Sequence, residues 1–237
     1  MAPTTTDIRT LVQGFAKHIT ELKAPEYKES QVRLHYIDPF WTLLGWDVQN
    51  TAQSAPQDVE VVVEPSMDSV EDDGLRSRQP DYLFRVNGFA RFVVEAKKPS
   101  VDLDADKRAI FQAKRYAWSA AIPFAILTDF EQFRLYDTTL KPVFHEPRRG
   151  LVKKFSLDYG SYEAQWDLLR DTFGRLPSKA ARSVKRPAAT RTVNQRAGDT
   201  SHFVGGFRVR LHRDTLYPYF SEADAPRLVR TRTRPVY

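Results

Sequence analysis

The sequence predicts an α/β fold with a central mixed β-sheet flanked by helices, and three observations support this fold class. The first 45 residues carry apolar side chains at spacings of three and four, which is typical of amphipathic helices. Two runs of β-strand character, residues 82–86 and 91–97, are separated by Asn87-Gly88, the strongest short hairpin signal. After Pro99, a helical run is followed by two short apolar runs, which together complete a mixed sheet with helices on its faces.

Two helices are expected in the amino-terminal region. Residues 7–23 predict one continuous amphipathic helix, and residues 27–44 predict a second. Glu29 falls within the apolar stripe of the second helix, where a carboxylate needs a partner or a function. Pro39 is expected to kink or restart this helix, because proline cannot donate a hydrogen bond to the preceding turn. Gly45 is expected to end it.

Strands and loops are expected around the hairpin. Residues 57–64 form a β-branched run that predicts a strand pairing with the strand that begins at Asp81. The polar, acidic stretch 66–79 between them predicts a loop. Its acidic residues have no regular spacing, which favours solvated charge over metal binding.

The second half of the predicted domain contains a helix, two strands and a final helix. A helix is expected over residues 103–121, with Asp102 or Asp104 near its start and small alanines, including Ala121, on its buried stripe. Strands are expected at 123–128 and 132–136. Residues 141–156 predict a crossing loop with room for an edge strand, and residues 162–173 predict the last helix.

Composition bounds the class of protein. The chain has 237 residues, of which 41% are hydrophobic, and this suits a soluble globular domain. The sequence has no signal-peptide pattern at its start and no apolar stretch long enough to cross a bilayer, so we expect a cytoplasmic protein without membrane partners. The absence of cysteine excludes disulfides and thiolate metal sites, and five scattered histidines make zinc improbable. Chemistry with hard metal ions stays open.

Charge divides the chain into two parts. From Gly174 onward there are twelve Arg and two Lys against three Asp and one Glu, a net charge of +10, whereas residues 1–173 carry −4. We therefore predict a folded domain over 1–173 and a disordered basic tail, or an interrupted connector, over 174–237. Because the folded part is not basic overall, any surface that faces nucleic acid must be a local patch.

The residues with the clearest chemical pattern lie on the predicted hairpin. Side chains alternate across a strand, so Glu95 and Lys97 emerge on one face, and the hairpin brings Asp81 back beside them. Carboxylate oxygens are the ligands that Mg²⁺ prefers, so Asp81 and Glu95 are candidate metal ligands. Lys97 could lower the pKa of a metal-bound water, stabilise the nascent anion or place a phosphate. Solvated charges at strand ends are the alternative interpretation.

The order of these residues resembles a known nuclease motif. Pro80-Asp81, thirteen intervening residues and then Glu95-Ala96-Lys97 resemble the active-site pattern of the PD-(D/E)XK nuclease superfamily. Together with the stretches 97–99, 112–118 and 127–133, the pattern resembles the amino-terminal nuclease domain of fused restriction–modification enzymes of type IIG and of the related type I restriction subunit. The resemblance covers roughly residues 5–173.

This resemblance implies a restriction-endonuclease-like fold and further site residues. It favours a place for Glu29 beside the metal, whereas the simplest alternative is an ion pair with Arg33 one turn later. Gln112 and Tyr116 match a glutamine-x-x-x-tyrosine motif, which implies that they contact the DNA backbone or position Lys97. The alternative is an ordinary buried amide and a boundary tyrosine.

The basic residues Lys98, Lys114 and Arg115 are candidate phosphate contacts, although surface solvation would also explain them. The implied activity is Mg²⁺-dependent cleavage of double-stranded DNA, with Mn²⁺ able to substitute, leaving a 5′-phosphate and a 3′-hydroxyl. A methyltransferase or specificity module, fused or associated, is the implied partner.

Two alternatives stay open at this point. The first is a catalytically silent nuclease-fold module that binds DNA or docks a methyltransferase or translocase partner. The second is a nuclease that acts on RNA or on particular nucleic-acid structures.

Overall fold

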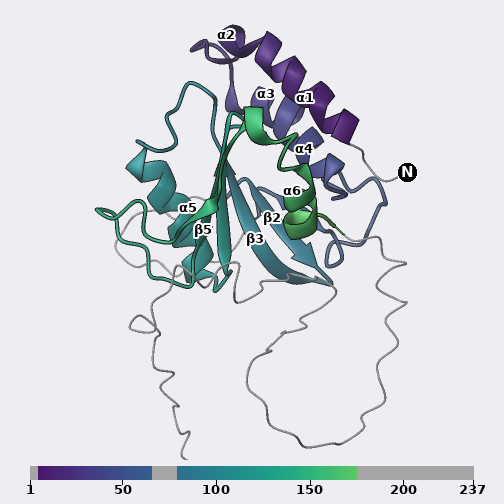
Figure 1. The fold of residues 1–237 in the computed structure, drawn as a ribbon. Coiled ribbons are helices and arrows are strands. Elements are labelled where there is room, and N and C mark those ends of the chain that lie inside the picture. The colour runs from purple at the N-terminus through teal and green to yellow at the C-terminus, as the bar shows by residue number, and fades with distance from the viewer. Residues whose placement is uncertain (1–4, 66–78, 176–237) are drawn as a thin grey trace, which may run out of the picture.

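The computed structural model describes residues 5–65 and 79–175. Within them, six strands form one sheet whose spatial order is the order of the chain, and Figure 1 shows helices on both faces. The strands are β1 Val61–Val63, β2 Tyr82–Val86, β3 Phe89–Ala96, β4 Phe124–Thr128, β5 Gln132–Asp137 and β6 Leu151–Asp158. Strands β3 and β4 are parallel and the other neighbouring pairs are antiparallel, so the predicted mixed α/β sheet is confirmed.

Helices cover the two faces of the sheet unequally. The helix α5 Lys107–Ser119 packs on one face and connects the parallel strands β3 and β4 (Figure 1). The other face carries most of the remaining helices, which are α1 Thr5–Lys17, α2 Ile19–Leu22, α3 Glu29–Val32, the π-helical turn η1 Arg33–Ile37, α4 Asp38–Leu43 and α6 Trp166–Phe173. A short 3₁₀ turn, η2 Tyr159–Ser161, precedes α6.

The larger hydrophobic core lies between the sheet and the amino-terminal helices. Trp41 of α4 is fully buried and its ring centroid lies 4.6 Å from that of Phe84 on β2. Phe84 in turn stacks on Phe92 of β3, with centroids 4.5 Å apart. On the opposite face, alanines of α5 such as Ala113 and Ala117 pack against Val93, which lets the helix approach the strands closely. The predicted alternation of β3 is therefore confirmed.

The amino-terminal helices are more broken than the periodicity predicts. The expected continuous helix over 7–23 is interrupted at His18, whose backbone leaves helical geometry between α1 and α2. The expected helix over 27–44 contains the π-helical turn η1, which ends at Ile37, and α4 follows directly from Asp38 with Pro39 in its first turn. The backbone stays helical at Ile37 and Asp38, so the prediction that Pro39 kinks or restarts the helix is not confirmed as a break in the chain. Gly45, with φ +90, follows the end of the helix as expected.

Several predicted boundaries are wrong for local reasons. The strand over 57–64 shortens to β1, because residues near Ala55 form hydrogen-bonded turns instead; β1 does pair with β2 as expected. The helix predicted over 103–121 begins at Lys107, capped by Asp106 rather than by Asp102 or Asp104. Ala121 lies beyond its end, exposed and at φ +53, rather than on the buried stripe.

The end of the described chain is tied to the core. The α6 helix starts later than predicted, at Trp166, and the Arg175 N–H donates to the Leu44 carbonyl at 2.7 Å. The predicted edge strand within 141–156 is found as β6.

The predicted loop over 66–79 falls mostly outside the described residues, as does the predicted tail from residue 176. The predicted domain boundary at 173/174 stays a prediction. No helix in the described ranges is long and apolar enough to span a membrane.

Candidate active site

The site is built by the hairpin of β2 and β3. Asn87 and Gly88 both have positive φ, at +52 and +78, so the turn is of the type that the Asn-Gly pair favours. The register pairs Tyr82 with Val94, which brings Asp81 to the end of β3. There the Oδ2 atom of Asp81 accepts a hydrogen bond from the Ala96 N–H at 2.7 Å. The predicted convergence of Asp81 with the end of β3 is thus present.

Glu95 is more buried than the other two candidate acids, Asp81 and Glu29, with 3% of its surface exposed. Its Oε1 atom accepts hydrogen bonds from Lys97 Nζ at 2.6 Å and from Gln112 Nε2 at 3.1 Å. Burial raises the pKa of Glu95 to about 7, and the nearby Lys97 ammonium only partly opposes this effect. Glu95 therefore holds its proton more tightly than an ordinary glutamate does.

Lys97 lies among acceptors. Besides Glu95, its ammonium donates to the Ala96 carbonyl at 2.8 Å and lies 3.7 Å from Oε2 of Glu29. Burial lowers the pKa of Lys97, but attraction to Glu95, Glu29 and Asp81 outweighs it, so the net shift is upward. Lys97 is accordingly an ammonium at neutral pH in this arrangement.

Glu29, the first residue of α3, reaches the same cluster from the helical layer. Burial raises its pKa, which Lys97 opposes. The local alternative was an ion pair of Glu29 with Arg33, one turn later. The ion pair found for Glu29 is with Lys97, while Arg33 forms ion pairs with Asp81 and Glu64.

Arg33 is a site residue whose role sequence reasoning missed. Its Nη1 atom lies 3.0 Å from Oδ1 of Asp81 and 3.0 Å from Oε1 of Glu64, and its Nε atom donates to the Tyr82 hydroxyl at 3.0 Å. The Tyr82 hydroxyl donates in turn to Asp38 Oδ1 at 2.6 Å. The only available signal was an arginine on the helix that carries Glu29, and its tertiary partner lies 48 residues away.

The predicted DNA-contacting residues fall into different surroundings. Gln112 joins the acidic cluster through Glu95. Tyr116 is 5% exposed and packs in the apolar cluster between α5 and the sheet. Lys114 is also buried, with its Nζ donating to the Pro147 carbonyl at 3.2 Å, and burial lowers its pKa to about 8. Lys98 and Arg115 are half-buried; Lys98 donates to the Pro25 carbonyl at 3.3 Å.

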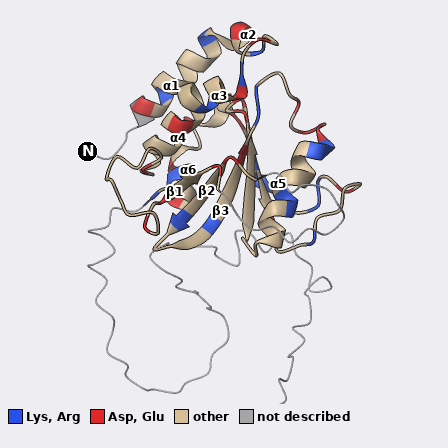
Figure 2. Ribbon diagram, turned by 180° about the vertical axis from the view of Figure 1, so that it is seen from behind, with Lys and Arg blue, Asp and Glu red and all other residues tan. Residues whose placement is uncertain are grey.

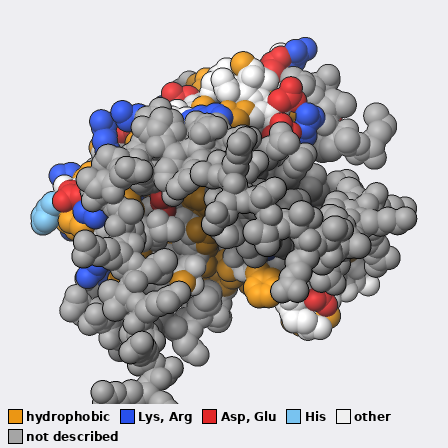
Figure 3. Space-filling model, turned by 60° about the horizontal axis from the view of Figure 1, so that its bottom comes forward, with side chains coloured by type: hydrophobic (Ala, Val, Ile, Leu, Met, Phe, Trp, Pro, Cys, Tyr) orange, Lys and Arg blue, Asp and Glu red, His pale blue; other side chains and the backbone are white. Residues whose placement is uncertain are grey.

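The charges in this region are mixed. Figure 2 shows acidic and basic residues together where α3 approaches the ends of the strands. On the face seen in Figure 3, the Lys and Arg side chains of the described residues that are in view lie apart, with acidic side chains among them.

The donor set suits a hard divalent cation. The described ranges contain no group of three or more His, Cys, Asp or Glu side chains arranged to hold a metal by themselves. Mg²⁺, however, commonly binds through one or two carboxylates and keeps waters or phosphate oxygens as its other ligands. Asp81 and Glu95, at the end of one hairpin, match that requirement.

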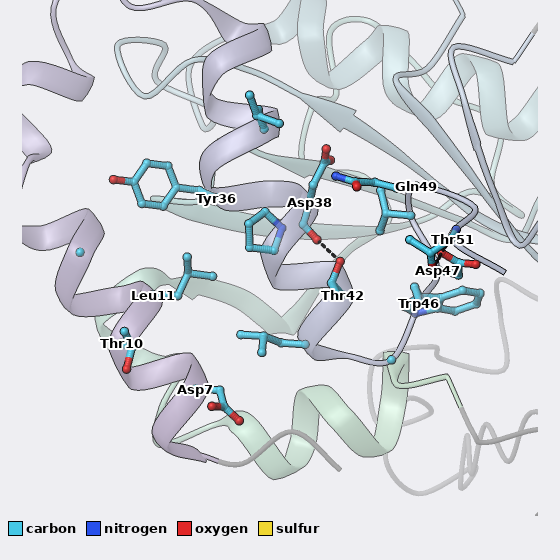
Figure 4. Close-up of a pocket in the computed structure, with 16 residues that line it drawn as sticks. Asp7, Thr10, Leu11, Tyr36, Asp38, Thr42, Trp46, Asp47, Gln49 and Thr51 are labelled. Carbon is cyan, nitrogen blue, oxygen red and sulfur yellow. Dashed lines mark hydrogen bonds between the residues drawn. The ribbon is translucent and has the colours of Figure 1, made fainter. Parts of the chain in front are cut away.

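A separate groove lies on the helical side. It has a volume of about 790 Å³ and is bounded by α1, by α4 and by the loop that follows Gly45 (Figure 4). Asp38 lines this groove and also accepts the hydrogen bond from Tyr82. Asp81, Glu95 and Lys97 are not among its lining residues, so the groove is not the candidate active site.

A known protein family matches the part of the chain that contains the hairpin of β2 and β3. Residues 58–143 match the family described as type I restriction enzyme R protein N terminus. The resemblance to restriction-enzyme nuclease domains is confirmed. The matched restriction-enzyme segment contains Asp81, Glu95, Lys97 and Gln112, whereas Glu29 precedes it.

A curated relative points the same way. The "Type II restriction enzyme and methyltransferase RM.Eco57I" of Escherichia coli is 32% identical over 130 residues. The aligned part is 55% of this chain and 13% of that protein, so the chain spans a small fraction of this restriction enzyme's length. No solved structure matches the chain.

Proposed function

We propose that this chain carries a Mg²⁺-dependent DNA endonuclease domain of a restriction–modification system. It would act in the cytoplasm on double-stranded DNA and leave a 5′-phosphate and a 3′-hydroxyl, with Mn²⁺ able to replace Mg²⁺. The similarity to restriction enzymes supports the class of protein, and the geometry of the hairpin supports the chemistry.

The observation that carries the proposal is the buried Glu95 carboxylate. An acid that is 3% exposed costs free energy unless it is compensated, and an apolar side chain would fill the same place without that cost. Strongly perturbed acids of this kind concentrate at functional sites. A second acid, Asp81, and the Lys97 ammonium lie beside it, which is the set of groups that phosphodiester hydrolysis uses.

Asp81 and Glu95 would hold the cation, which when bound supplies a Lewis acid and an activated water. Lys97 keeps its proton at Nζ and donates to a phosphate oxygen or to the attacking water, stabilising negative charge as it develops. Gln112 holds Glu95 in place through Oε1, so that carboxylate needs no reorientation. Glu29 adds a third acid near Lys97 and keeps it charged.

The substrate contacts proposed around this site are local. Lys98 and Arg115 are partly accessible and could reach phosphates next to the hairpin. Tyr116 and Lys114, both nearly buried, would support α5 and hence Gln112. Recognition of base edges would belong to a methyltransferase or specificity module that works with this domain.

The test is Mg²⁺-dependent nicking of supercoiled plasmid by the 237-residue chain, by Lys97→Ala and by the control Lys154→Ala. Lys154 lies exposed on β6, so its variant removes one lysine charge away from the hairpin. We expect the wild type and Lys154→Ala to nick equally, and Lys97→Ala to be slower by about 100-fold or more.

Two outcomes would overturn the proposal. Equal nicking by wild type and Lys97→Ala would mean that the cleavage does not come from this site. DNA binding without nicking in either Mg²⁺ or Mn²⁺ would favour a silent nuclease-fold module.

A further inference from the structure

Arg33 forms an ion pair with one of the two carboxylate oxygens of Asp81, a candidate metal ligand. Oδ2 of Asp81 is bound by the Ala96 N–H, and Oδ1 lies 3.0 Å from Nη1 of Arg33. The side chains of Arg33 and Asp81 are 15% and 14% exposed, so this ion pair is largely shielded from water. The second acid on Nη1, Glu64, is 72% exposed and contributes less, because exposed pairs are screened.

The backbone is shaped to keep Arg33 there. Arg33 begins the π-helical turn η1, and Asp38 follows it by five positions. In an α-helix these two side chains would point about 140° apart. Here both reach the same atom, the Tyr82 hydroxyl, with Nε of Arg33 donating to it and Asp38 accepting from it. π-Helical turns inside α-helices are rare and are frequent at functional sites.

The position of Arg33 has an electrostatic consequence. A guanidinium and a divalent cation that share one carboxylate repel each other, and the repulsion is stronger where water is largely excluded. The ion pair between Arg33 and Asp81 therefore contributes most to stability when no metal is present, and binding of a cation at Asp81 weakens this ion pair. By linkage, the guanidinium weakens cation binding by the same factor.

We propose that Arg33 is a built-in counter-ion that competes with the divalent cation for Asp81. It compensates the buried carboxylate in the metal-free protein and sets how much metal is needed to fill the site. This inference rests on the proposed metal-dependent function, and it assigns Arg33 as a positioning residue that acts through Asp81.

The test measures Mn²⁺ binding by calorimetry to the 237-residue chain without DNA, so that nuclease activity is not the readout. Arg33→Met should bind Mn²⁺ about tenfold more tightly than the wild type, within the range typical of coupled sites. Arg33→Lys keeps the charge and should stay within about threefold of the wild type. The control Arg85→Met removes a partly buried arginine whose contacts are the Val59 and Pro56 carbonyls, and it should leave Mn²⁺ binding unchanged.

A milder variant keeps the inference testable if Arg33→Met does not fold. Tyr82→Phe keeps the charge of Arg33 and removes the hydroxyl that accepts from Nε of Arg33 and donates to Asp38, and it should tighten Mn²⁺ binding about two- to threefold. The melting temperature without metal should fall in Arg33→Met, and Mn²⁺ should raise it more than in the wild type.

The outcomes separate this inference from the proposed function. If the wild type binds Mn²⁺ and neither Arg33→Met nor Tyr82→Phe binds it more tightly, the counter-ion role is wrong while the metal site stands. If neither the wild type nor any variant binds Mn²⁺ in this measurement, and the same holds when it is repeated with DNA present, the metal-dependent function is wrong and the counter-ion role falls with it.

Discussion

The Asp81 carboxylate and the Ala96 N–H are joined by a 2.7 Å hydrogen bond across the open end of the β2–β3 hairpin. Ala96 is fully buried, so this N–H has no access to solvent. A candidate metal ligand thus also completes the hydrogen bonding of the strand that carries Glu95. The hydrogen bonding at the end of β3 and the proposed metal binding therefore depend on the same side chain, that of Asp81.

The first prediction separates these two roles of Asp81. Asp81→Ala leaves a buried N–H without an acceptor and should lower the free energy of unfolding of the metal-free protein by about 1–3 kcal/mol. Asp81→Asn retains an oxygen acceptor and should be more stable than Asp81→Ala by about 1 kcal/mol. Both should lose plasmid nicking. Urea denaturation in EDTA measures the difference, and equal stability of the two variants would show that the hydrogen bond contributes nothing.

The second prediction concerns pH and Asp129, in the turn between β4 and β5. Asp129 is 1% exposed; its Oδ1 accepts from the Gln132 N–H, while Oδ2 has no hydrogen-bond partner among the described residues. Burial raises the pKa of Asp129 to about 8. Because the folded protein binds this proton more tightly than the unfolded chain, Asp129 makes a contribution to stability that is lost as pH rises from about 4 to about 8.

Asp129→Asn removes that titration and keeps the acceptor for Gln132. Its free energy of unfolding relative to the wild type should therefore increase by about 2–5 kcal/mol between pH 4.5 and pH 8.5. Asp171→Asn, on the exposed side of α6, is the control and should differ from the wild type by less than about 0.5 kcal/mol at both values. A constant difference for Asp129→Asn would mean that Asp129 is ionised throughout this range.

The third prediction compares two glycines. Gly150 precedes β6 at φ +81, and a Cβ added there would lie 2.5 Å from the Asp137 carbonyl oxygen. Gly150→Ala should therefore destabilise the protein by about 2 kcal/mol or more. At Gly160 an added Cβ meets nothing within 4 Å, so Gly160→Ala should change stability by less than about 1 kcal/mol. Thermal denaturation of both variants tests this, and equal melting temperatures would contradict it.

The sequence was most informative where local patterns act over a few residues. Asn87-Gly88 specified the hairpin, because few dipeptides accept positive φ at both turn positions. The alternation of β3 then indicated that Glu95 and Lys97 share a face, and their 2.6 Å contact agrees. The fold class followed from the order of helical and strand patterns.

What the sequence did not predict depends on contacts far along the chain. The periodicity of residues 27–44 contains no sign of the π-helical turn, which is tied to Tyr82 through Arg33 and Asp38. Glu29, one turn before Arg33, suggests a local ion pair between these two residues. In the structure, however, Arg33 forms its largely buried ion pair with Asp81. The helix α5 begins at Lys107 rather than at residue 103, because Asp106, and neither Asp102 nor Asp104, accepts hydrogen bonds from the first N–H groups of the helix.

The spatial order of the sheet has a consequence for truncated forms of the chain. Each strand lies beside its predecessor in the chain, so the pairing of β2 with β3, which brings the two acids and the lysine together, does not itself require β4. Without β4, which follows α5, one edge of β3 stays open to pairing with other chains. A fragment that ends just after Lys98 would thus be prone to aggregation, whereas one that extends past Thr128 has the segment that closes this edge.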